Sequence, residues 1–250
     1  MSLTTNERQH IRRLLRWAFE ILQHLVPKPV EVVRQGGYTF RYRERMVEQA
    51  MVQKLARVIS GLSAIEALSQ EGFFQEQAAL QRVHDELTED IDFMCLALSA
   101  GERCATLEQL MGAFYAEPIS ERGVQRAPLK GPNSPPRKKI RARIASLVQS
   151  AGYSHNHVNA GATISHAYSS FVHGSSEAIM DMYDGRSGRF LVDGMQSSEF
   201  AEDHRADADN YYFRSVVAVA QVAMILEAHE VLIQVKAAHD QISLRIGITD

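Results

Sequence analysis

Two long runs of apolar residues at helical spacing constrain the fold of this chain more than any other feature. The first run, over residues 40–69, carries Val47, Met51, Leu55, Val58, Leu62 and Ile65, and the second, over residues 73–99, carries Leu80, Val83, Leu87, Ile91, Met94 and Leu98. Apolar side chains three or four residues apart share one face of an α-helix. Only a short Glu71-Gly72 turn separates the runs. The sequence therefore predicts a long antiparallel helical hairpin.

The same periodicity predicts further helices on both sides of this hairpin. They cover about residues 4–26, 106–115, 136–152, 155–184 and 198–239, the last of them with a bend. Thr4 and Glu7 form a capping box at the start of the first helix, and Pro27 ends it. A short strand pair is expected only at residues 186–195. We therefore expect an all-α bundle of six or seven helices, built as one domain over residues 1–250.

Composition narrows the class of protein. Charged residues make up 23% of the 250 residues and the formal net charge is −3, which excludes a generally polycationic nucleic-acid binder. No apolar run approaches the roughly 18 residues of a membrane span, so no membrane partner is expected. The two cysteines, Cys95 and Cys104, cannot form a disulfide framework. With no apolar signal segment at the N-terminus, these features predict a cytoplasmic protein.

A proline-rich, basic segment interrupts the helical pattern. Five of the seven prolines lie between residues 118 and 136, which predicts a flexible loop over residues 117–136. Residues 117–143 contain eight Lys or Arg and two Glu. The candidate nucleic-acid contacts are Arg137, Lys138, Lys139, Arg141 and Arg143. Because no aromatic residues are interleaved for base stacking, a solvated loop is the favoured interpretation and phosphate contact the alternative.

Four of the ten histidines fall between residues 155 and 173. On one continuous helix, Tyr168, Phe171, Val172, Ile179 and Met182 would face the core. The opposite, polar face would carry Asn159, Thr163, His166, Ser170, His173, Glu177 and Asp181. Imidazoles transfer protons near neutral pH, so His173 and His166 are the candidate catalytic residues and the other five would line the site. A solvated face and a subunit interface without chemistry remain the alternatives.

Metal and cofactor chemistry finds little support in the sequence. His155 and His157 do not by themselves supply the three or four converging ligands of a zinc site, so no metal and no cofactor is predicted. The pairs His84-Asp85 and His239-Asp240 leave a metal-dependent phosphohydrolase as a weak alternative. Phosphate-loop, nucleophile-elbow and His-Glu-x-x-His motifs do not occur.

The run from Tyr168 to Ser175, YSSFVHGS, resembles a signature of bacterial all-helical proteins of unknown function: Tyr, two residues, Ser, an aromatic residue, Val, His, Gly or Ala, and Ser. More distantly it is similar to the HEPN superfamily of helical ribonucleases and nucleotide-binding modules. That resemblance implies a dimer and an Arg four to six intervening residues before the His near the subunit interface. Here the matching positions before His173 hold His166, Ala167 and Tyr168, and one residue rather than two separates Tyr168 from Ser170.

Together these patterns predict a helical binding or regulatory module that is HEPN-like, forms homo-oligomers and contacts RNA or a partner protein. The first alternative is a metal-independent ribonuclease in which His173 and His166 transfer protons. The second is the metal-dependent phosphohydrolase. Whether the protein is an enzyme stays open at this point.

Overall fold

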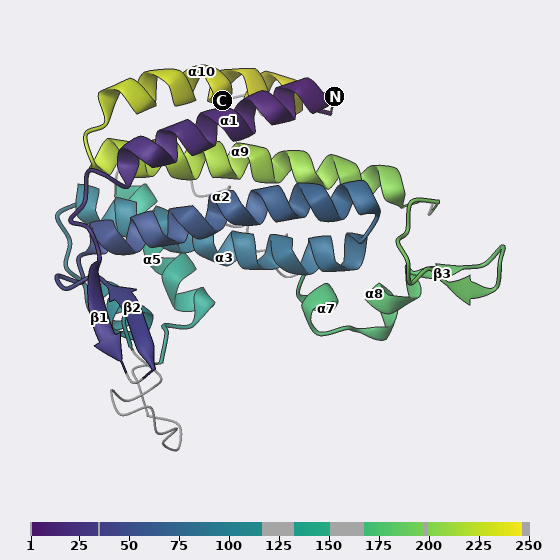
Figure 1. Cartoon of the computed structure of the whole chain (residues 1–250), viewed down its shortest axis with the longest axis horizontal. Coiled ribbons are helices and arrows are strands. Elements are labelled where there is room, and N and C mark those ends of the chain that lie inside the picture. Colours follow the sequence, from purple (N-terminus) through teal and green to yellow (C-terminus); the bar gives the residue numbers. More distant parts are fainter. Residues whose placement is uncertain (1, 35, 117–132, 151–167, 198–199, 247–250) are drawn as a thin grey trace.

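The computed structural model describes residues 2–34, 36–116, 133–150, 168–197 and 200–246. Within these ranges it contains nine helices and two small two-stranded sheets. The all-α prediction is confirmed, and the helices form an elongated bundle from whose two ends smaller elements project (Figure 1).

The predicted helical hairpin is the centre of the bundle. Helices α2 (Val47–Glu71) and α3 (Phe74–Ser99) pack along their length and are joined by Gly72, which adopts the left-handed conformation (φ +78°). That conformation suits glycine, and it lets the backbone N–H of Phe73 bond to the Leu68 carbonyl as the helix ends. The first helix of this hairpin, α2, starts at Val47 and not near residue 40 as predicted. Residues 30–41 instead form a β-hairpin, β1 (Val30–Arg34) and β2 (Gly37–Arg41), which the helical pattern did not predict.

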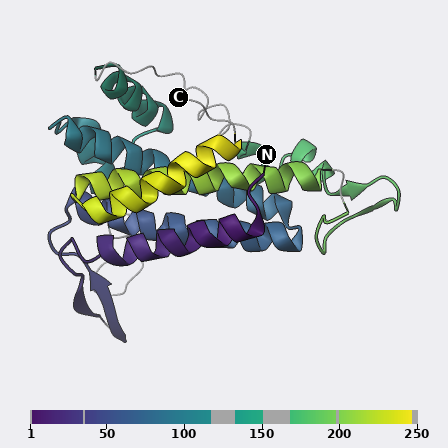
Figure 2. The same cartoon turned by 90° about the horizontal axis from the view of Figure 1, so that it is seen from above.

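Three more long helices cover α2 and α3. Helix α1 (Thr5–Leu22) begins at the predicted capping box of Thr4 and Glu7. Helix α9 (Ala201–Ile225) packs on both α2 and α3, and α10 (His229–Ile246) folds back along α9. Figure 2 shows α10 lying over α9 with α1 beside it. The segment predicted as one bent helix is thus two helices, separated at Glu227, whose φ is +55°.

Two shorter helices complete one side. Helix α4 (Ala105–Phe114) follows α3 closely, and α5 (Arg137–Ser150) lies against α3. The residues of α5 that face inward are Ile140, Ile144, Leu147 and Val148. The predicted loop at 117–136 falls mostly outside the described residues, so its flexibility remains a prediction.

One hydrophobic cluster joins all of these helices. Its largest fully buried side chains include Tyr211, Tyr212, Phe93, Leu15, Leu22, Met51, Leu55, Leu62, Ile65, Ile91 and Met94. Burying such side chains stabilises the fold by about 1.5–3 kcal/mol each relative to leaving them in water. Packing of these aromatic and aliphatic side chains holds the bundle together.

The segment predicted as the histidine helix is broken. Its described part forms two short helices, α7 (Ser169–Val172) and α8 (Ser176–Met180). Gly174 stands between them with φ +59°, and the Ser175 side chain caps α8 by accepting from the Ala178 N–H. The prediction of one continuous helix as far as residue 184 is therefore wrong. The predicted short hairpin exists but begins earlier, as β3 (Tyr183–Asp184) and β4 (Arg189–Phe190).

None of the helices in the described part of the chain combines the length and the apolar character that crossing a bilayer requires.

Candidate functional site

The described members of the predicted polar stripe do not lie on one helix. Asn159, Thr163 and His166 lie outside the described residues. Ser170 is in α7 and His173, which is exposed, follows that helix, whereas Glu177 is in α8 and Asp181 follows it. The apolar face also differs from the prediction, because Val172 and Ile179 are exposed. The break at Gly174 turns α8 relative to α7, so spacing on one helix no longer applies.

Aromatic contacts dock α7 onto the bundle. The Tyr168 hydroxyl donates to the Asp207 carboxylate at 2.8 Å, and its ring contacts Phe171 and Tyr211. Phe171 in turn packs edge-on against His204, whose ring stacks on Phe74 at a centroid distance of 5.0 Å. Burial lowers the pKa of His204. The buried side of α7 is thus a structural attachment.

A buried polar cluster lies beneath this attachment, between α3 and α9. The Ser215 hydroxyl donates to the Tyr211 carbonyl at 2.7 Å, so it accepts from Nε2 of His84 at 3.0 Å. Burial, aided by Arg214, lowers the pKa of His84 to about 3. Asp85 pairs with Arg214 at 2.8 Å, and burial raises its pKa to about 6 despite this partner. The sequence did not indicate these contacts.

The arrangement of His84 and Asp85 offers no support to the phosphohydrolase alternative. Both side chains are enclosed and face Ser215 and Arg214, and the second pair, His239 and Asp240, lies on α10. Nowhere in the described ranges do three His, Cys, Asp or Glu side chains come together as metal ligands. Strongly shifted pKa values often mark active sites, but they also arise in buried structural networks such as this one.

Most of the predicted basic residues bind other parts of the chain. Arg137 pairs with Asp90 at 2.7 Å, and Arg141 pairs with Glu89 at 2.5 Å. Arg143 pairs with Glu102, and Lys139 donates to Gln109. Lys138 is exposed. The pairs with Asp90 and Glu89 attach α5 to α3. A role for the five residues in nucleic-acid binding remains a prediction.

An open groove of about 350 Å³ lies between α1 and α10. Its lining consists of His10, Arg13, Leu14, Trp17, Glu230 and Gln234. Volumes of this order suit small ligands, but such sites usually enclose most of the ligand surface. We assign no ligand to this groove.

The feature that the helical interpretation missed is the β1–β2 hairpin. It projects from one end of the bundle (Figure 1). Tyr38 and Phe40 share one of its faces, with ring centroids 5.6 Å apart, and Val33 lies across from Tyr38. These three side chains are 63%, 56% and 81% exposed. Large apolar groups are thus presented to solvent on a ribbon outside the core.

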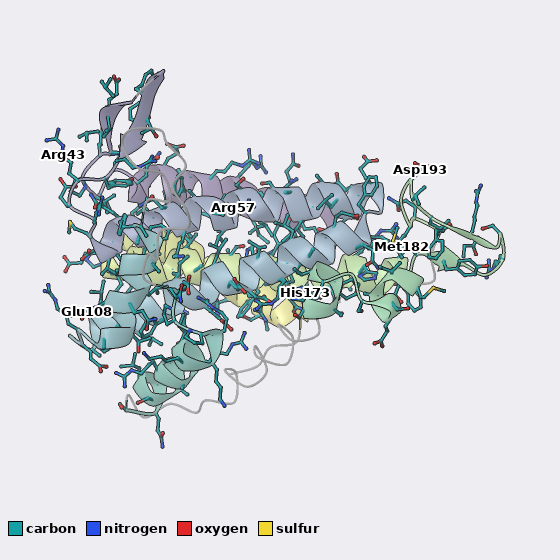
Figure 3. All side chains as sticks on the ribbon, turned by 90° about the horizontal axis from the view of Figure 1, so that it is seen from below. Arg43, Arg57, Glu108, His173, Met182 and Asp193 are labelled. Atoms are coloured by element: carbon teal, nitrogen blue, oxygen red, sulfur yellow. The ribbon has the colours of Figure 1, made fainter. Side chains whose placement is uncertain are left out.

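The hairpin segment also carries an excess of positive charge. Residues 28–45, which we call the aromatic–basic hairpin, contain five Lys or Arg residues and two Glu. Arg41 lies on the face opposite the rings, where its Nη1 donates to Thr39 and to the Phe40 carbonyl. Arg43 follows at the base of the ribbon, where it is exposed (Figure 3). In the order Tyr38-Thr-Phe40-Arg41-Tyr42-Arg43, aromatic residues are interleaved with basic ones, as they are not in residues 117–143.

No protein-family model, curated protein or solved structure matches this chain.

Proposed function

We propose that this protein is a homo-oligomeric helical module that binds single-stranded RNA through the aromatic–basic hairpin and does not cleave it. The observation that carries the proposal is the pair of exposed rings, Tyr38 and Phe40, on a projecting ribbon rich in arginine. The HEPN-like resemblance at residues 168–175 is the reason for choosing RNA over DNA.

The exposed rings have a chemical use in such a complex. An isolated two-stranded hairpin is at best marginally stable in water, so one that also exposes large apolar side chains gains from a partner that covers them. Nucleic-acid bases stack on aromatic rings with about 1–3 kcal/mol per base and little sequence preference. The edge-to-face geometry of Tyr38 and Phe40 leaves ring surface for one or two bases.

The distribution of charge favours an anionic partner at this end. The whole chain has a formal net charge of −3, yet residues 28–45 hold five of its 27 Lys and Arg residues. An acidic body with a basic arm orients an approaching polyanion toward the arm. Arg43 and Lys28 provide the phosphate contacts, and each such contact makes the affinity more dependent on salt.

Cleavage by His173 lacks the second group that such chemistry needs. General acid–base catalysis of RNA cleavage also requires stabilisation of the charged phosphorane, usually by a cation. His173 is exposed after a single helical turn, and in the sequence none of the three positions that the resemblance assigns to arginine, residues 166–168, is an arginine. We therefore retain the ribonuclease of His173 and His166 as the alternative to be tested.

Binding is tested with a fluorescein-labelled single-stranded RNA of about 12 nucleotides, followed by fluorescence anisotropy. We expect Tyr38→Ala and Phe40→Ala each to weaken binding about tenfold, because each loses a stacked base. Arg43→Gln should reduce the slope of log K against log[salt] by about 0.7, the value for one phosphate on a single strand.

Two conservative variants serve as matched controls. Tyr38→Phe keeps the ring and should bind like the wild type, whereas Tyr38→Leu keeps apolar area without a ring and should bind like Tyr38→Ala. Equal affinity in Tyr38→Ala and the wild type would remove the hairpin from the RNA site. Tighter binding to DNA of the same sequence would overturn the choice of RNA.

The catalytic alternative is tested on the same RNA by gel electrophoresis in EDTA. We expect the RNA to stay intact with both the wild type and His173→Ala. Cleavage by the wild type that His173→Ala abolishes, with an unchanged melting curve, would replace the binding module by the ribonuclease.

A further inference from the structure

The end of the bundle opposite the hairpin exposes a second apolar surface. It belongs to residues 168–196, which we call the α7–β4 arm: α7 lies against α3, and the β3–β4 part extends beyond the ends of α2, α3 and α9 (Figure 1). Its exposed large apolar side chains are Val172, Ile179, Met180, Tyr183, Phe190 and Val192. All six fall within 21 positions of the chain, and two of them, Tyr183 and Phe190, pack against each other with ring centroids 5.3 Å apart. Large apolar side chains exposed together are typical of an interaction surface.

The arm is fixed to the bundle by contacts at its base. The Met195 N–H donates to the Gly72 carbonyl at 2.8 Å, and the Gln75 side chain donates to the Ala178 carbonyl at 2.7 Å. Met195 is buried against Phe74 in a small hydrophobic cluster of its own. Gly194 passes so close to α2 that a Cβ there would lie 2.5 Å from the Glu71 carbonyl oxygen. The apolar surface is therefore held in one orientation, which lowers the entropic cost of covering it.

Charges on the arm are separated along its length. Its tip carries two exposed arginines, Arg186 in the turn and Arg189 at the start of β4. Glu177 and Asp193 lie nearer the bundle and are exposed as well, and Figure 3 shows Asp193 at this end of the molecule. Asp184, also near the tip, accepts hydrogen bonds from the backbone of the turn. The basic tip of one arm is therefore complementary to the acidic base of a second, identical arm that runs antiparallel to it.

We propose that a second copy of this chain covers the arm, with the two arms antiparallel about a two-fold axis. The tip of each copy then meets the base of the other, so that each of Arg186 and Arg189 faces Glu177 and Asp193 of the second copy. Such an isologous contact uses one surface twice and closes at a dimer. This inference rests on the homo-oligomer of the proposed function and names its interface; it does not depend on RNA binding.

A charge exchange between the two ends of the arm tests this geometry. The tip variant is Arg186→Glu with Arg189→Glu, and the base variant is Glu177→Arg with Asp193→Arg. In either variant alone, like charges meet at both contacts of the dimer, which raises the dimer dissociation constant at least about tenfold. In a mixture, every contact between one tip variant and one base variant joins opposite charges.

Sedimentation velocity supplies the readout, with full-length protein at several concentrations. The expected result is a dimeric wild type, two variants that are monomeric separately, and a dimer when they are mixed in equal amounts. Recovery in the mixture also shows that both variants are folded. Because a different partner protein would not produce this recovery, the exchange identifies a second copy as the occupant.

Each other outcome overturns a distinct statement. A monomeric wild type at about 100 μM would remove both the homo-oligomer of the proposed function and this interface. A dimeric wild type whose tip and base variants both stay dimeric would place the interface elsewhere. A mixture that stays monomeric would overturn the antiparallel arrangement.

Discussion

His84→Gln and Asp85→Asn should change the pH dependence of stability in opposite directions. The two residues are neighbours in α3 and both are enclosed between α3 and α9, where the neutral form of each is favoured. Burial lowers the pKa of His84 to about 3 from 6.5 and raises that of Asp85 to about 6 from 3.8. Lowering the pH therefore makes the burial of His84 destabilising, because the imidazole would have to stay unprotonated. It makes the burial of Asp85 more favourable, because the carboxyl group becomes neutral.

The sizes of the two contributions follow from linkage between protonation and folding. Below pH 6.5 His84 becomes protonated in the unfolded chain but stays neutral in the folded protein. Between pH 7 and pH 4 this difference lowers the free energy of unfolding by about 3 kcal/mol. Over the same range the folded protein takes up a proton at Asp85 before the unfolded chain does. That uptake adds about 2 kcal/mol, and in the wild type the two effects largely cancel.

Urea unfolding at pH 7, 6, 5 and 4 measures both effects as differences from the wild type. Between pH 7 and pH 4, His84→Gln should gain about 3 kcal/mol relative to the wild type and Asp85→Asn should lose about 2 kcal/mol. A suitable control is His24→Gln, at an exposed position, which should run parallel to the wild type. Parallel curves for all four proteins would show that burial does not shift the pKa values of His84 and Asp85.

The long helices were predictable because their information is local and repeated. Residues 47–71 and 74–99 each bury one face over several turns, so a few irregular positions do not change the helical period. The capping box at Thr4 and Glu7 and the glycine at Gly72 are local as well. Such features can be recognised in the sequence without knowledge of the tertiary contacts.

The β1–β2 hairpin was not predicted because its sequence lacks such a repeated local signal. Neither face of β1 and β2 is buried in the core. The sequence therefore lacks the alternation of apolar and polar residues that usually identifies a strand with one buried face. Phe40 also falls in a register that extends the helical pattern of α2 backward. The Gly36-Gly37 pair between two β-prone runs was the available signal, since glycine pairs suit tight hairpin turns.

The candidate site was misjudged where one residue changed the backbone direction. Gly174 followed by Ser175 is the order in which one helix ends and another begins, and the structure places that break in the middle of the predicted polar stripe. The buried cluster of His84 and Ser215 had no local signal. Its members are 131 residues apart in the sequence, and only the packing of α3 on α9 joins them.

A second large effect is expected from Arg8→Met, which should destabilise the protein by about 3–5 kcal/mol. Arg8 extends from α1 into the junction with α2 and α9, where it pairs with Asp209 at 2.8 Å and with Glu66 at 3.3 Å. Both carboxylates are almost fully buried. Without the guanidinium, two like charges remain close together in a poorly solvated site. Arg13→Met, at an exposed position of the same helix, should change the free energy of unfolding by less than about 0.5 kcal/mol.

Neutralising the carboxylates together with Arg8 should recover most of this loss. The triple variant Arg8→Met, Glu66→Gln, Asp209→Asn leaves no buried charge at the junction. Its amide oxygens still accept from the Tyr212 hydroxyl and the Leu3 N–H, as the carboxylates do in the native protein. Urea unfolding at pH 7 should therefore rank the triple variant above Arg8→Met alone. The reverse order would show that Arg8 acts through its packing over Tyr212 and its bond to the Arg205 carbonyl, and not through its charge.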